Sequence, residues 1–281
     1  MRYTKGRVVF ALVIALLLGS HSWAQTSAAA VVLGSNTAKN GFKNEDEIRD
    51  KFNAWRTDAD ARGWLAAMGY DIGGVESVVA RKPHGEKADV EVRIKFFPQS
   101  RQDANVLREM REGISIKLVS SPNGFNQIDK RWLATYAKKW RMPSEVQSAL
   151  KLFVGEVPPT VKGRHPKRMY LNEFDAVTQK SVIDFFAANR AEIVSDLFAG
   201  DGVHAAGWMM VAFKATEKTR WIIKTDDEAI KFFGDGKIEI TRAGNLKIGR
   251  ITMQRKGGDG GRETAKMLQF KINPVLLFDA K

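Results

Sequence analysis

The pattern of apolar and polar positions predicts helices in the first half of the chain and strands in the second. Apolar residues recur at helical spacing over residues 44–68, 128–140, 144–155 and 173–198. Strand-like runs cover residues 75–81, 89–97, 114–120, 208–213, 221–224, 237–241, 247–254 and 267–272. Asn44 is the expected N-cap of the first helix, and Ser144 with Gln147 has the spacing of a capping box. This order predicts an α/β fold with a mixed sheet core, flanking helices and a strand-rich C-terminal region.

The first 30 residues have a different pattern. Arg2, Lys5 and Arg7 precede an apolar run over residues 8–19, and small residues follow around Ala24. A basic start, an apolar centre and small residues in this order are typical of a secretory signal peptide. The run is too short for a comfortable membrane span, and no other stretch has 18 apolar residues. We therefore expect a leader over residues 1–30, a folded domain over 31–281 and no stable association with a membrane.

Charge adds information about the partner. The 281 residues include 45 Lys and Arg against 32 Asp and Glu, a net charge of +13, of which +10 belongs to residues 31–281. Such an excess favours a polyanionic partner, either nucleic acid or an anionic membrane surface. The chain has no Cys, which excludes disulfides, thiolate metal sites and cysteine nucleophiles.

Two of the predicted strands carry candidate chemistry. Alternation places Asp89 on one face of its strand, and Ser115 and Lys117 on one face of another. If the two strands pair as a hairpin, Asp89 comes close to Lys117. The Asp would bind Mg²⁺ together with the backbone carbonyl of Ile116, and the Lys would steady the attacking water or the developing charge on the phosphate. Taken alone, the same alternation also describes an ordinary strand with one solvated face.

A second carboxylate lies on the same face. Glu91 stands two residues beyond Asp89 and is a candidate substitute metal ligand. The alternative is a surface Glu that pairs with Arg93 or Lys95.

Three longer segments carry a family resemblance: NGFKNEDEIRDKF, ISIKLVSSPNGFNQIDKRWLATYAKKW and ITMQRKGGDGGRETAKMLQFKINP. Together they resemble the small type II restriction endonucleases that cut GCGC, members of the PD-(D/E)XK superfamily. The resemblance implies a restriction-endonuclease-like fold and Mg²⁺-dependent cleavage of double-stranded DNA that leaves a two-base 5′ overhang. By position, Asp89 matches the metal-binding Asp of that family and Lys117 matches its catalytic Lys.

The sequence departs from the family pattern at two positions and in the length of the segment between Asp89 and Lys117. Ser115 stands where the superfamily has an acid and this family has Gln, and Ala88 stands where relatives can carry Ser. A hydroxyl is a poorer metal ligand than a carboxylate, so Ser115 bears on the rate more than on the reaction. The segment RQDANVLREMREG lengthens the distance between Asp89 and Lys117, and we expect it to form a helical insert.

The C-terminal region is a candidate for DNA recognition. Residues 237–271 contain nine Lys and Arg and three Asp and Glu, with four glycines in RKGGDGGR. Arginine matches guanine in the major groove, and a carboxylate accepts from cytosine. The expected contact residues are Gln254, Arg255, Lys256, Asp259, Arg262 and Glu263. The alternative is a flexible hairpin turn with a solvated basic face.

The segment SSPNGFNQIDK follows the catalytic strand directly and is the second contact candidate. Phe125 resembles the family's inserting Phe, and a Phe at a glycine-flanked tip can wedge between base steps. Asn126, Gln127 and Lys130 are its expected companions. The alternative is that Phe125 packs beneath its own loop.

These observations lead to a sequence-specific endonuclease that acts on GCGC in the cytoplasm. Such an enzyme requires a cytosine methyltransferase that protects the host's own sites. The leader supports an alternative, a less specific nuclease in the periplasm or outside the cell, and Ser115 supports another, a catalytically weak DNA-binding protein. A further explanation of the leader is a misplaced start codon, with the true start downstream. No Met occurs between Met1 and Met68, so such a start needs an alternative codon. Val31, Val32 and Leu33 are the residue types that the alternative start codons GTG and TTG encode.

Overall fold

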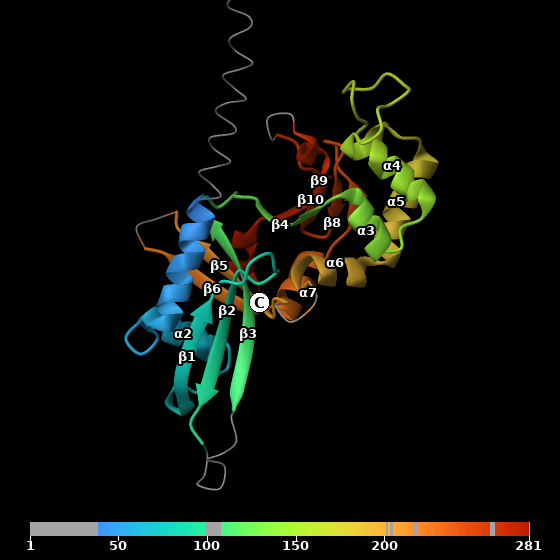
Figure 1. Cartoon of the computed structure of the whole chain (residues 1–281). Helices are drawn as coiled ribbons and strands as arrows, with labels where there is room; N and C mark the ends of the chain where they lie inside the picture. The colour runs from blue at the N-terminus through green and yellow to red at the C-terminus, as the bar shows by residue number, and fades with distance from the viewer. Residues whose placement is uncertain are drawn as a thin grey trace, which may run out of the picture.

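The computed structural model describes residues 39–98, 108–200, 202, 205–215, 218–258 and 262–280. In these ranges the chain forms two five-stranded sheets (Figure 1). Sheet A has the order β1 (Val75–Arg81), β2 (Val90–Phe96), β3 (Glu109–Val119), β5 (Trp208–Phe213) and β6 (Arg220–Thr225). Sheet B has the order β4 (Asn126–Arg131), β10 (Leu268–Ile272), β9 (Ile251–Arg255), β8 (Leu246–Ile248) and β7 (Ile238–Ile240). Sheet A is mixed, because β3 and β5 are parallel and its other neighbours are antiparallel.

Helices cover both sheets. A helix over residues 39–53 and α2 (Ala59–Ala67) bury Phe52 and Trp64 in one apolar cluster with Val92 and Ile94 of sheet A. The other described helices are α3 (Leu133–Lys139), α4 (Ser144–Val154), α5 (Ala176–Ala188), α6 (Arg190–Phe198) and α7 (Asp226–Gly234). Short 3₁₀ helices cover Ile72–Gly74, Leu171–Glu173, Glu263–Lys266 and Pro274–Asp279. No helix in the described ranges has the length and apolar character of a membrane span.

The α/β prediction is confirmed, including the mixed sheet and the strand-rich C-terminal region. The predicted strand over 75–81 coincides with β1. The helical insert is wrong for residues 109–113, which form the start of β3 and pair with β2. Residues 101–107 of that insert lie outside the described residues. Through these extra residues, β1, β2 and β3 form a long arm that extends away from sheet B (Figure 1).

The single helix predicted over 44–68 is two helices. Asp58 interrupts it, because its side chain accepts a hydrogen bond from the Ala61 amide at 2.9 Å and thereby begins α2. Asn44 is not an N-cap but lies inside the first helix, 2% exposed. The helix predicted from Ser144 is present, but Pro143 is its N-cap and the capping box does not form.

The helix predicted over 128–140 begins too early. Its first four residues belong to β4, which pairs with β10 from the opposite end of the chain. That distant pairing overrides the helical spacing of the local sequence. Similarly, the strand predicted over 247–254 is a hairpin of β8 and β9 that turns at Gly249, whose φ is 57°. The helix α7 was not predicted.

A buried network of charges joins the two sheets. Asp129 of β4 accepts hydrogen bonds from Lys87 at 3.3 Å, from Arg131 at 2.6 Å and from the Tyr136 hydroxyl at 2.8 Å. Arg131 also reaches Asp196 of α6 at 2.8 Å. Lys139 and the Trp140 indole complete the contacts of Asp196, at 2.6 and 2.9 Å. Because Lys87 lies just before β2, this network ties sheet A to β4 and α6.

We expect Asp196→Ala to lower the free energy of unfolding at neutral pH by about 3 kcal/mol, because it removes the buried carboxylate that Arg131, Lys139 and the Trp140 indole share. Burial opposes ionisation of Asp196, but hydrogen bonds from Lys139 and Arg131 hold its pKa below the ordinary value. The carboxylate therefore stabilises the fold above its unfolded pKa, and the difference between wild type and variant shrinks as pH falls below about 4. Urea unfolding at several pH values measures this. Asp184→Ala, which breaks an exposed pair with Lys180, is the control, with a change below about 1 kcal/mol.

Candidate active site

The paired strands β2 and β3 bring Asp89 and Lys117 together. Antiparallel pairing sets Val90 opposite Ile114, and the Asp89 amide donates to the Ile114 carbonyl at 2.9 Å. The Lys117 Nζ then lies 3.7 Å from Oδ2 of Asp89. The hairpin expected from the sequence is therefore present with the register that the site requires.

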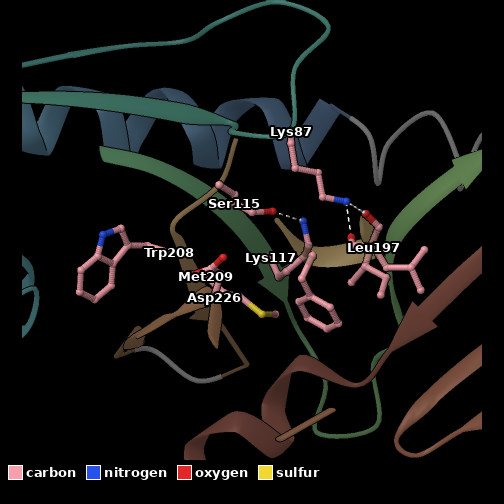
Figure 2. A pocket seen from close by; sticks show the side chains of 10 residues that line it. Lys87, Ser115, Lys117, Leu197, Trp208, Met209 and Asp226 are labelled. Atoms are coloured by element: carbon pink, nitrogen blue, oxygen red, sulfur yellow. Dashed lines mark hydrogen bonds between the residues drawn. The ribbon is translucent and has the colours of Figure 1, made fainter. Parts of the chain in front are cut away.

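Three oxygen atoms surround the Lys117 ammonium group. It donates to Oγ of Ser115 at 2.9 Å (Figure 2). It also donates to the Ile116 carbonyl at 3.2 Å and lies beside the Asp89 carboxylate. The Ile116 amide donates to Oδ2 of Asp89 at 2.6 Å and holds that carboxylate in place. The Ser115 hydroxyl is 3.4 Å from the same oxygen. These side chains and the Ile116 carbonyl thus converge on one point that accommodates a positive charge.

This donor set fits Mg²⁺. A carboxylate, a carbonyl and a hydroxyl are hard oxygen donors, which Mg²⁺ prefers. The described residues contain no group of three or more His, Cys, Asp or Glu side chains placed to hold a metal ion. An ion held by Asp89 and Ile116 would therefore take its remaining ligands from water and phosphate, as Mg²⁺ commonly does.

Glu91 belongs to a different arrangement. Its carboxylate is 2% exposed and has both oxygens engaged. Oε1 accepts from Nε of Arg81 at 2.8 Å and from Nε of Arg93 at 3.3 Å, and Oε2 pairs with Arg111. Two of these arginines come from the neighbouring strands, which the sequence could not place. We assign Glu91 to this ion-pair cluster and not to the metal site, and it is buried, not on the surface.

Two residues near the site were missed in the sequence. Glu45, in the helix over 39–53, pairs with Lys82 at 3.0 Å. Burial raises the pKa of Glu45 and the nearby charge of Asp89 raises it further, while Lys82 and Lys117 oppose this. Lys87 is buried, which lowers its pKa, and it donates to the carbonyls of Ile128 and Leu197 (Figure 2). Glu45 lies in the NGFKNEDEIRDKF segment and Lys87 lies two residues before Asp89, but only the tertiary packing shows that their side chains lie near the site.

A small cavity lies beside the Lys117 side chain. Its volume is about 10 Å³, and its lining includes Lys87, Ser115, Lys117 and Asp226. This is space for about one water molecule among polar groups.

The loop between β3 and β4 presents Phe125. Its side chain is 60% exposed, so it does not pack beneath its own loop. Asn126 turns inward, since its Nδ2 donates to the Leu118 carbonyl at 3.1 Å and closes the loop. Of these two predicted contact residues, Phe125 is the one whose side chain is open to a partner.

Other candidates meet on one face of sheet B. The register places Lys130, Gln269 and Gln254 side by side on β4, β10 and β9, and Gln127 lies on the same face. Gln269 donates to Oε1 of Gln127 at 2.7 Å and accepts from Nε2 of Gln254 at 3.4 Å. Gln269 is only 6% exposed and was not among the predicted contacts. Strand pairing alone reveals that it connects residues more than 120 positions apart in the sequence.

The remaining C-terminal candidates are spread out. Arg255 is partly buried, and its Nε donates to the Val154 carbonyl at 2.8 Å. Lys256 is half-buried. Arg262 and Glu263 are exposed, with Glu263 paired to Lys266 at 2.8 Å. Asp259 lies outside the described residues.

Comparison with known proteins gives the family and the fold. The family model described as R.HinP1I restriction endonuclease matches residues 68–278. The chain belongs to the R.HinP1I restriction endonuclease family. It is thus a type II site-specific deoxyribonuclease. The fold is similar to that of restriction endonuclease MspI, solved in complex with its cognate DNA. That likeness has a TM-score of 0.53 and 13% sequence identity, and covers 82% of this chain and 83% of MspI. No curated protein sequence matches the chain significantly.

We expect Lys117→Met and Asp89→Asn each to reduce DNA cleavage by about 100-fold or more, because the first removes a cation placed to stabilise the reacting phosphate and the second removes the charged ligand expected to hold Mg²⁺. Binding to duplex DNA should persist, since the recognition candidates lie on other segments. Nicking and linearisation of supercoiled plasmid measure cleavage, and fluorescence anisotropy measures binding. Lys180→Met, on the exposed side of α5, is the matched control. Near-normal turnover in either active-site variant would show that these strands do not form the catalytic site.

Proposed function

We propose that this protein is a Mg²⁺-dependent restriction endonuclease that hydrolyses DNA phosphodiester bonds at GCGC sites. The observation that carries the proposal is the convergence of Asp89, Ser115 and the Ile116 carbonyl around the Lys117 ammonium group. The GFNQIDK and QRKGGDGGRETAKMLQFK segments support the choice of sequence.

Each residue of the site has a separate role in the proposed hydrolysis. Bound Mg²⁺ supplies positive charge to the scissile phosphate and acidifies an attacking water. Asp89 and the Ile116 carbonyl would hold the ion, and the Ile116 amide orients Asp89. Lys117 positions the attacking water and stabilises the charge that develops on the phosphate. Ser115, which accepts from Lys117, holds that ammonium group in place.

The polar face of sheet B supports recognition of G·C pairs. In the major groove guanine presents acceptors and cytosine presents a donor. Because Gln269 donates to Gln127 and accepts from Gln254, it leaves an amide donor on Gln127 and an acceptor on Gln254. Arg255 and Arg262 would add donors for guanine, with Glu263 and Asp259 as acceptors for cytosine. The exposed ring of Phe125 suits a wedge between base steps.

A cutter of GCGC inside the cell requires a partner enzyme. We infer that a cytosine methyltransferase protects the host's own sites, because cleavage of the chromosome would otherwise be lethal. This requirement favours action in the cytoplasm. The leader over residues 1–30 favours the alternative of export to the periplasm or medium. The third hypothesis is a member of this family that binds DNA but cuts it weakly, because Ser115 stands in the place of an acid.

We expect purified protein with Mg²⁺ to cut unmethylated plasmid DNA into the fragments of a GCGC digest, and to spare the same plasmid after methylation of those sites. EDTA should abolish the cleavage, because the metal supplies charge that no described side chain replaces. Gel electrophoresis of the three reactions reads out the result. A smear of random fragments would favour the less specific nuclease, and intact DNA in every lane would favour the binding protein.

We expect the mature protein in its native cells to begin at residue 31–33 in the cytoplasm, where restriction acts on incoming DNA. N-terminal sequencing combined with cell fractionation measures this. A processed N-terminus after Ala24, with activity in the periplasm or medium, would establish export in its place.

A further inference from the structure

The face of the β1–β3 arm that carries Glu91, here called the arm face, is open to solvent and basic. Glu91 is 2% exposed, whereas the side chains of Arg81, Arg93 and Arg111 around it are 51%, 41% and 35% exposed. The carboxylate therefore lies beneath the three guanidinium groups, and the guanidinium groups form the surface. Val79, opposite Arg93, is 57% exposed, which shows that no other described part of the chain covers this face.

The arm face has excess positive charge. Beyond the active site, the charged residues that the strand register places on this face are four cations, Arg81, Arg93, Lys95 and Arg111, and two carboxylates, Glu91 and Glu109. A buried carboxylate held by several guanidinium groups is stable only while those groups stay in place. Glu91 consequently holds the arginines in a defined arrangement, which reduces the entropy that they lose when they bind an anion.

The arm face continues the active-site face of sheet A. Asp89, Glu91 and Arg93 alternate along one strand and therefore point to the same side, with Lys117 of β3 on that side too. Arg93 lies four residues from Asp89, about 13 Å along the strand. Each DNA strand carries one phosphate per 3.4 Å of helix axis. A duplex with its scissile phosphate at Asp89 therefore has neighbouring phosphates within reach of these arginines.

We propose that the arm face binds the sugar–phosphate backbone of duplex DNA on one side of the scissile bond and contributes affinity without sequence preference. The inference rests on the proposed function, in that it places the scissile phosphate at Asp89 and Lys117. It also gives the long Asp89–Lys117 segment a role, because Arg111 lies in the residues that extend β3.

The experiment measures binding of the full chain to a GCGC duplex and to a scrambled duplex, without Mg²⁺, over about 50–200 mM salt. Arg93→Ala should weaken binding to both duplexes by the same factor. It should also reduce the slope of log affinity against log salt concentration by about 0.9, because one phosphate contact is lost. Arg81→Ala should do the same, and Arg93→Lys, which keeps the charge, should retain the slope. Arg62→Ala is the matched control, because Arg62 lies on α2, which covers the opposite face of sheet A. Thermal unfolding of each variant confirms that the fold is intact.

Each outcome has a distinct meaning. If the slope is unchanged in both alanine variants while the wild type binds and cuts DNA, the proposal that the arm face binds DNA is wrong. The proposed function is then unaffected. A loss confined to the GCGC duplex also overturns the arm-face proposal, since base contacts would then be responsible. If Arg62→Ala changes the slope as much as Arg93→Ala does, the proposal is also wrong, because the change then reflects the overall charge of the protein and not a contact at the arm face. Wild type that binds neither duplex overturns both proposals.

Discussion

The ion pair between Lys87 and Asp129 is the contact on which the arrangement of the site depends. Lys87 lies two residues before Asp89, and Asp129 lies on the first strand after the loop that carries Phe125. This contact therefore connects the segment just before β2, which carries Asp89, to β4, which carries Gln127 and Lys130. The further bonds from Lys87 to the carbonyls of Ile128 and Leu197 make this connection costly to break.

One face of sheet A, next to that contact, contains two different electrostatic environments. Near Lys117 the oxygens of Asp89, Ser115 and Ile116 create a site for a cation. Two residues after Asp89, the buried Glu91 is surrounded by arginines whose side chains form the exposed surface. The two carboxylates differ in environment because their neighbours differ, although Asp89 directly precedes β2 and Glu91 lies two residues later on the same face.

Ser115 shows how the site tolerates a small side chain. Its hydroxyl contacts the Lys117 ammonium group directly, and a cavity large enough for about one water lies beside them. A larger residue would occupy that space, whereas Ser leaves room for solvent among Lys87, Asp226 and the catalytic strand. Ser115 therefore contacts the Lys117 ammonium group directly and leaves space beside it.

The sequence by itself determined which of the candidate side chains share a strand face. Two-residue alternation placed Asp89, Ser115 and Lys117 on particular faces, and this local property survives in β2 and β3 because side-chain direction follows directly from the extended backbone. The sequence also favoured a basic, DNA-directed body and the overall α/β order.

Only the tertiary structure decided which distant residues meet. Residues 128–131 read as helix but became β4, because β10 supplied the backbone partners that a strand requires. Glu91 met Arg81 and Arg111 through strand register, and Gln127 met Gln254 through Gln269. Strand pairing joins backbone groups irrespective of their separation along the chain, so no local pattern contains this information.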